Sequence, residues 1–92
     1  MKVFCINVGD DYWFFAANTE DEALNAYYAH SGWSDERDML RRGGDPIEEV
    51  DAITEEALDT IEFDCKITNK RRSLRDALNN TTNPGFITCV WY

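Results

Sequence analysis

The sequence predicts an α+β fold: one small domain over residues 1–92, with a four- or five-stranded, mainly antiparallel sheet and two to four short helices packed against it. Apolar and polar residues alternate over 61–68, which is typical of a strand with one face on a core. Two capping-box patterns, at 19–22 and 73–76, predict helix starts. A chain of 92 residues with 43% hydrophobic residues has room for one core.

The N-terminal third predicts a β-hairpin followed by a helix. Residues 2–8 and 12–17 are rich in β-branched and aromatic side chains, and the Gly-Asp-Asp of 9–11 is a tight-turn sequence. The Thr19 hydroxyl can accept from the amide of Glu22, whose carboxylate can reach back. A helix is therefore expected over 20–31.

This helix should pack on the hairpin through one apolar stripe, and Gly32 suits the left-handed position after its end. The stripe consists of Ala23, Leu24, Tyr27 and Tyr28. A second helix is expected over 35–42, with Ser34 as its cap and with acids in its first turn and arginines in its last, which suits the helix dipole. The sequence Gly-Gly-Asp-Pro ends it.

The C-terminal half predicts two or three further strands and two short helices. Residues 47–53 suit a partly exposed strand or an extended segment, and Thr54 can cap a helical turn that runs to residue 59. The alternating strand comes next, followed by a polar turn over 69–72.

Ser73 then caps a helix expected over 74–80, and a loop with Pro84 follows it. Residues 86–92 are apolar on both faces, which predicts a strand paired inside the sheet.

Charge and composition narrow the classes of function. The net charge of −9 opposes direct binding of nucleic acid or of an anionic membrane surface, so a charged partner should be basic. The apolar run at 3–8 is too short for a signal-peptide core or a membrane span, so a cytoplasmic protein is expected. A monomer is also expected. The three cysteines, Cys5, Cys65 and Cys89, lack paired spacing and are typical of buried free thiols.

No catalytic site or cofactor is expected. The single histidine, His30, lies near a helix end without a nucleophile or acid partner in the sequence, and is expected to be a surface or capping residue. A zinc site made of His30 and the three cysteines would need ligands that are scattered along the chain. The aromatic run 12–15 could stack bases, but without interleaved basic residues it is expected to be core.

A basic cluster lies in the C-terminal third, where residues 65–92 carry a charge of +4. It could bind a phosphate or an acidic partner, and an intramolecular complement to the preceding acidic segment is the favoured alternative. Its members are Lys66, Lys70, Arg71, Arg72 and Arg75.

The segment 45–64 is the most unusual feature, because it holds nine carboxylates and no basic residue. On an extended chain, side chains of one face recur about every 6.6 Å, which is of the order of the spacing between successive phosphates on a nucleic-acid strand. Such a surface can substitute for DNA, although acidic surfaces also serve solubility alone. The candidate partner-binding residues are Asp45, Glu48, Glu49, Asp51, Glu55, Glu56, Asp59, Glu62 and Asp64.

Taken with the small size and the opening that runs strand, turn, strand and capped helix through 16–23, this acidic run resembles the small acidic anti-CRISPR proteins of phages. The resemblance implies a non-enzymatic inhibitor in the bacterial cytoplasm that mimics DNA. It would occupy the basic DNA-binding surface of a CRISPR surveillance complex, through those nine carboxylates and without a cofactor. The alternative is a protein-interaction module anchored by an exposed aromatic such as Trp33 or Tyr28.

Overall fold

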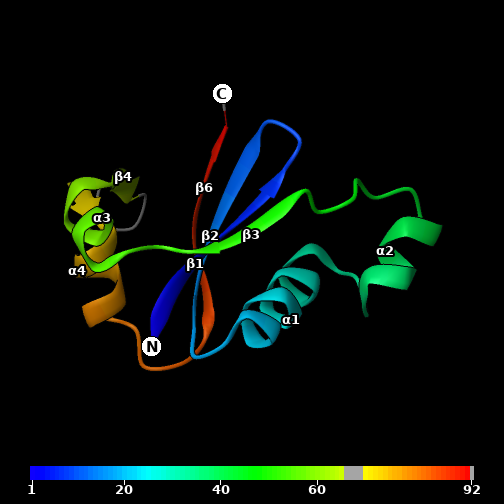
Figure 1. Cartoon of the computed structure of the whole chain (residues 1–92), viewed down its shortest axis with the longest axis horizontal. Helices are drawn as coiled ribbons and strands as arrows, with labels where there is room; N and C mark the ends of the chain where they lie inside the picture. Colours follow the sequence, from blue (N-terminus) through cyan, green and yellow to red (C-terminus); the bar gives the residue numbers. More distant parts are fainter. Residues whose placement is uncertain (66–69, 92) are drawn as a thin grey trace.

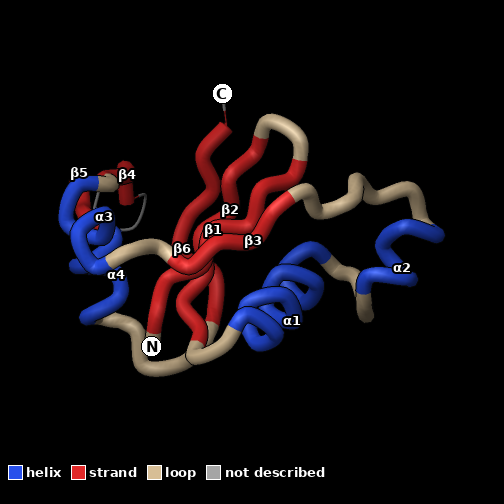
Figure 2. The backbone as a smooth tube through the Cα atoms, in the orientation of Figure 1, coloured by secondary structure: helices blue, strands red, loops and turns tan. Residues whose placement is uncertain are grey.

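The computed structural model describes residues 1–65 and 70–91, and within them it contains six strands and four helices (Figures 1 and 2). The strands are β1 (Lys2–Val8), β2 (Asp11–Ala17), β3 (Glu49–Ala52), β4 (Glu62–Cys65), β5 (Lys70–Ser73) and β6 (Gly85–Trp91). The helices are α1 (Glu20–Ser31), α2 (Glu36–Arg41), α3 (Glu55–Thr60) and α4 (Leu74–Asn79). The predicted α+β fold class is confirmed.

A four-stranded antiparallel sheet with the order β3-β1-β2-β6 forms the middle layer. The hairpin predicted at the N-terminus supplies its two central strands, in a register that pairs Val8 with Asp11 and Lys2 with Ala17. Gly9 makes this tight turn possible because its φ of 59° lies in the left-handed region. The hairpin thus provides the scaffold on which both edge strands pair.

Helices cover both faces of this sheet, with α1 and α2 on one side and α3 and α4 on the other (Figure 1). Alternate residues of the hairpin therefore enter two separate cores. The first core packs Phe4, Ile6 and Phe15 against α1 and α2, and the second packs Val3 and Phe14 against α3, β4 and α4. Burial on both faces explains why the hairpin is so rich in aromatic residues.

The predicted boundaries of α1 are confirmed. Thr19 Oγ1 accepts a 3.2 Å hydrogen bond from the Glu22 amide, and the Glu22 carboxylate accepts from the backbone amide of Asn18 rather than from that of Thr19. At the other end Gly32 adopts φ 84°, and the amide of Trp33 donates to Tyr28 O. Three of the four residues in the predicted stripe are buried, so α1 packs on the hairpin as expected.

Helix α2 is capped by Asp35 rather than by the predicted Ser34, because the Asp35 carboxylate accepts from the Asp38 amide at 2.8 Å. The buried Asp38 carboxylate in turn accepts from the Ser34 amide and forms ion pairs with Arg41 and Arg42 at 3.0 and 3.3 Å. These donors favour the charged form and lower the pKa of Asp38 from 3.8 to about 2.

The predicted polar turn over 69–72 is wrong, because Lys70–Ser73 forms β5 and pairs antiparallel with β4. These two strands form a separate small sheet, so the alternating strand predicted over 61–68 does not join the main sheet; residues 66–69 lie outside the described part. Its apolar Phe63 still enters a core, packed with α3 and α4. Strand β5 has no apolar alternation, and the sequence pattern therefore missed it.

The prediction that the last strand lies inside the sheet is also wrong. Strand β6 pairs with β2 and, in the described part of the chain, with no other strand, so it forms one edge. Its side chains are apolar in both directions because each face of the sheet carries its own core. Apolar residues on both faces indicate two covered faces, and they do not report on lateral pairing.

Across residues 1–65 and 70–91, none of the helices has the length and apolar character that a membrane crossing requires.

The second core can be tested at Leu58, which is 2% exposed in the six-residue helix α3. We expect Leu58→Ala to lower the free energy of unfolding by about 2 to 5 kcal/mol, since it removes buried methyl groups and leaves a cavity. Urea denaturation would measure this. Leu40→Ala is the matched control, because Leu40 lies in the six-residue α2 and is 48% exposed; its effect should stay within about 0.5 kcal/mol. Equal losses in the two variants would contradict the packing described.

A second test concerns Asp38. Because its pKa is lower in the folded state, its contribution to stability is fully present above 3.8 and is lost as the pH falls through about 2. Asp38→Asn should therefore lower the melting temperature at pH 7, and the gap from wild type should close between those two pH values. Asp35→Asn is the control, since asparagine caps helices as well as aspartate does. A gap that is independent of pH would show that the ion pairs do not matter.

Candidate functional site

The nine carboxylates of 45–64 are all exposed, but the structure distributes them over several elements. They do not form the single extended row that the sequence suggests. Asp45 and Glu48 precede β3, Glu49 and Asp51 lie within it, three acids lie on α3, and two lie on β4. Some of these carboxylates contact an arginine and others do not, and this difference divides the nine into two groups.

Arg75 neutralises part of the acidic surface of α3. Its guanidinium contacts Asp59 at 2.8 Å and Glu55 at 2.9 Å, and it also donates to the backbone oxygen of Glu55. The Arg75 side chain extends from α4 to the acids of α3 and is one-third exposed. These two carboxylates raise the pKa of Arg75 above its ordinary value.

Arg71 neutralises the acids of β4 in a similar way. It lies opposite Asp64 in the antiparallel pair and contacts that carboxylate at 3.5 Å and Glu62 at 3.1 Å. Opposite charges on neighbouring strands stabilise their pairing, and this explains how a strand as polar as β5 forms. The intramolecular complement expected from the sequence is thus confirmed for Arg71 and Arg75.

The remaining five carboxylates form no ion pair with any residue in 1–65 or 70–91. Three of them, Glu48, Glu49 and Asp51, lie along the outer edge of the sheet, and we call these three the acidic edge. The structure adds Asp45 before this edge and Glu56 after it. The candidate site is therefore narrower than the sequence indicates.

Charge is concentrated on one side of the acidic edge. Glu49 and Asp51 are two residues apart and point to the same face, where their partners in the register are Asn7 and Cys5. A hydrogen bond with Asp51, together with the repulsion between the two carboxylates, raises the pKa of Glu49. Burial raises the pKa of the Cys5 thiol to about 11, and both acids add to this shift. Cys5 is therefore a poor nucleophile at neutral pH.

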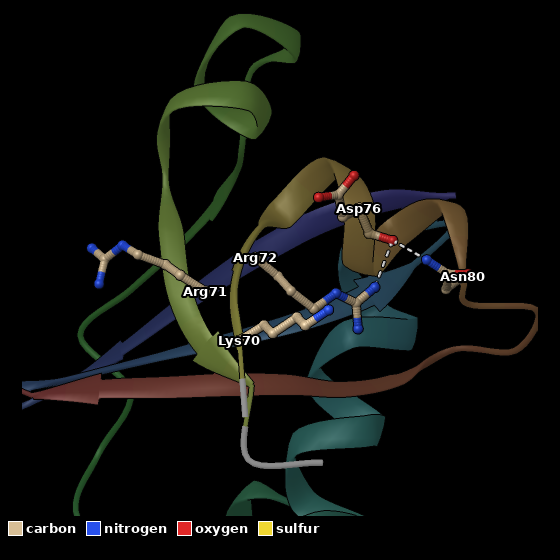
Figure 3. Close-up of a pocket in the computed structure, with 5 residues that line it drawn as sticks. All are labelled: Lys70, Arg71, Arg72, Asp76 and Asn80. Carbon is tan, nitrogen blue, oxygen red and sulfur yellow. Dashed lines mark hydrogen bonds between the residues drawn. The ribbon is translucent and has the colours of Figure 1, made fainter. Parts of the chain in front are cut away.

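Figure 3 shows a shallow hollow between β5 and α4, lined by Lys70, Arg71, Arg72, Asp76 and Asn80. Arg72 Nη2 and Asn80 Nδ2 both donate to the backbone oxygen of Asp76, at 3.0 and 2.8 Å. Arg71 points away from Lys70 and Arg72 (Figure 3). The basic cluster is therefore split, with one arginine committed to the acids of β4.

His30 lies exposed in the last turn of α1 and stacks on Phe86, with ring centroids 4.2 Å apart. It packs over the face of the sheet opposite to that of Cys5. No cluster of three metal-ligating side chains occurs within the described residues. The rings of Trp13 and Phe15 also contact His30, so its neighbours are aromatic.

The two aromatic anchors considered from the sequence are not free. Tyr28 is 8% exposed in the first core, and Trp33 is half-buried with the Arg42 guanidinium 4.9 Å from its ring centroid. Among the aromatic side chains whose burial is described, the large exposed one is instead Phe86, at 42%. Sequence reasoning missed it because its strand reads as apolar throughout.

The charge pair on β3 predicts an unusual pH dependence. The pKa of Glu49 is raised in the folded state. The free energy of unfolding therefore falls as the pH rises from 4.5, the ordinary pKa of glutamate, through the pKa of Glu49 in the folded protein. Glu49→Gln should therefore stabilise the protein at pH 7 and should have no stabilising effect below that window. Chemical denaturation at several pH values would measure this.

Asp45→Asn is the control for the effect of removing one charge from an acidic protein, since Asp45 is exposed in the loop before β3. If Glu49→Gln and Asp45→Asn changed stability equally at every pH, repulsion between Glu49 and Asp51 would be ruled out as the cause.

Comparisons with protein-family models, with curated proteins and with solved structures find no match to this chain.

Proposed function

We propose that this protein is a non-enzymatic inhibitor, of the phage anti-CRISPR kind, that presents its acidic edge to the basic DNA-binding surface of a CRISPR surveillance complex and thereby blocks target DNA. The observation that carries the proposal is the set of five exposed carboxylates without an ion pair among the described residues, two of them on the edge strand β3 and a third, Glu48, directly before it. The target class follows from the resemblance given above.

The geometry suits a surface that imitates a nucleic-acid strand. Among residues 1–65 and 70–91, strand β3 pairs with β1 alone, which leaves its other side for a partner. Same-face carboxylates on a strand lie about 6.6 Å apart, a spacing that lysines and arginines of a DNA-binding channel can match. A basic partner would also relieve the repulsion between Glu49 and Asp51, which gives the acidic edge a reason to bind cations.

The acids of α3 and β4 that form ion pairs are less available to a partner. Their ion pairs with Arg71 and Arg75 are exposed and each is worth little, yet a partner would have to compete with these arginines. We therefore assign binding to Asp45, Glu48, Glu49, Asp51 and Glu56. Glu55, Asp59, Glu62 and Asp64 are assigned to internal ion pairs.

Neutralising the acidic edge tests the proposal. The triple variant Glu48→Gln/Glu49→Gln/Asp51→Asn should weaken binding to a purified surveillance complex roughly three- to a hundredfold, since each exposed ion pair contributes about 0.2 to 1 kcal/mol. Competition with duplex target DNA at two salt concentrations would measure the loss. The matched control removes three exposed charges elsewhere, as Glu20→Gln/Asp21→Asn/Glu36→Gln. Equal effects of the two variants would reduce the interaction to net charge.

The arginine pairs distinguish the five-carboxylate site from the nine-carboxylate site of the sequence hypothesis. In Arg71→Gln/Arg75→Gln, the four carboxylates of α3 and β4 lose their partners, and thermal unfolding would check that the fold is intact. A site confined to the acidic edge predicts nearly unchanged affinity. Markedly tighter binding would indicate that all nine carboxylates contribute to the interface.

A second candidate function follows from Phe86. Its exposed ring on an edge strand is the kind of aromatic anchor that a protein-interaction module uses, in place of Trp33 or Tyr28. Loss of partner binding in Phe86→Ala, with the acidic-edge variant silent, would favour this alternative.

A further inference from the structure

The outer edge of β6 is open along its length in the described part of the chain. Strand β6 is seven residues long and hydrogen-bonds to β2 as its one partner strand among those residues. An edge strand leaves a row of backbone N–H and C=O groups unpaired, and these groups can pair with another strand. The edge is thus a preformed template for one more antiparallel strand.

The two edges of the sheet differ in how they are protected. Strand β3 has four residues, of which two are acidic, and short charged edges resist pairing with other chains. Strand β6 contains no charged residue and no proline. One bulge at Ile87, where the register shifts between Phe14 and Phe15, interrupts it, and the strand continues regularly from Thr88 to Trp91.

An aromatic patch borders this open edge on the α1 side. The Phe86 ring is 42% exposed and lies against His30, Trp13 and Phe15, with centroid distances of 4.2, 6.0 and 5.6 Å. An exposed aromatic beside unpaired backbone groups combines an apolar anchor with hydrogen-bonding capacity. Strand addition uses this combination.

The neutral β6 edge suits a second copy of this chain as the occupant. The chain carries −9, so two copies repel each other wherever their acidic surfaces meet. The acidic edge lies on β3, at the opposite end of the strand order from β6. Two copies that meet through β6 would place their acidic edges at the two ends of an eight-strand sheet, which keeps the acidic edges apart.

We propose that β6 pairs antiparallel with β6 of a second copy of this chain, so that a symmetric dimer with one continuous sheet forms. A two-fold axis brings identical strands together in the antiparallel direction, and the contact closes on itself without further growth. The dimer leaves both acidic edges exposed. The inference goes beyond the proposed function and does not depend on it, and it differs from the monomer expected from the sequence.

Sedimentation velocity over about 1 μM to about 1 mM tests the dimer, since one strand pair with an aromatic anchor buries less than the roughly 800 Å² per partner of a typical stable interface. We expect a monomer–dimer equilibrium within this range. Phe86→Lys should shift it to monomer, because it places a charge beside the paired strands. Leu40→Lys is the matched control, as Leu40 is 48% exposed on α2, and this variant should dimerise normally. A wild-type protein that is monomeric at the highest concentration would overturn the proposal.

Hydrogen exchange provides a readout that needs no mutation. Backbone amides of residues 87–91 should exchange more slowly at high than at low protein concentration, while those of β3 should not change. Higher salt should strengthen the dimer by screening the repulsion between two acidic chains, whereas it should weaken binding of the acidic edge to a basic partner. Protection of β3 in place of β6 would place the contact at the wrong edge and refute the assignment.

Discussion

The fold depends on the hairpin of β1 and β2 being buried on both faces. Neither strand can turn a polar face to water, so each side needs its own cover, which α1 and α2 supply on one side and α3, α4 and the small sheet on the other. Both central strands already have two hydrogen-bonded neighbours, and any lateral contact with another molecule is left to the edges. The two faces of the sheet therefore provide stability, and the two edges are available for binding.

Charge then makes the two edges different. Arg71 and Arg75 hold four of the nine acids in internal pairs, which link β5 to β4 and α4 to α3. Of the five acids of 45–64 that form no ion pair among the described residues, four lie on β3 or before it and Glu56 lies on α3, while β6 carries no acid. The basic partner and the second copy proposed above would therefore use edges at opposite ends of the sheet.

The sequence predicted well those elements that depend on residues close together in the chain. The hairpin follows from its turn and its apolar runs, and the caps Thr19, Thr54 and Ser73 each accept the amide hydrogen bond expected of them. Strand β5 was missed because it has no apolar pattern, and its pairing and ion pairs with β4 depend on residues outside its own segment. The alternating segment before it was recognised as a strand, but its partner strand was not, since pairing depends on distant residues.

The sequence by itself determined the fold class, the hairpin, the helix starts and the concentration of acid in 45–64, because each follows from neighbouring residues or from composition. Only the tertiary structure decided which acids remain unpaired, since Arg75 reaches Glu55 and Asp59 across 20 and 16 residues of chain. Strand order was likewise decided in three dimensions. An apolar strand looks the same in sequence whether it is central or at an edge when both faces of the sheet are covered, and so the open edge of β6 could be recognised only once its neighbours were known.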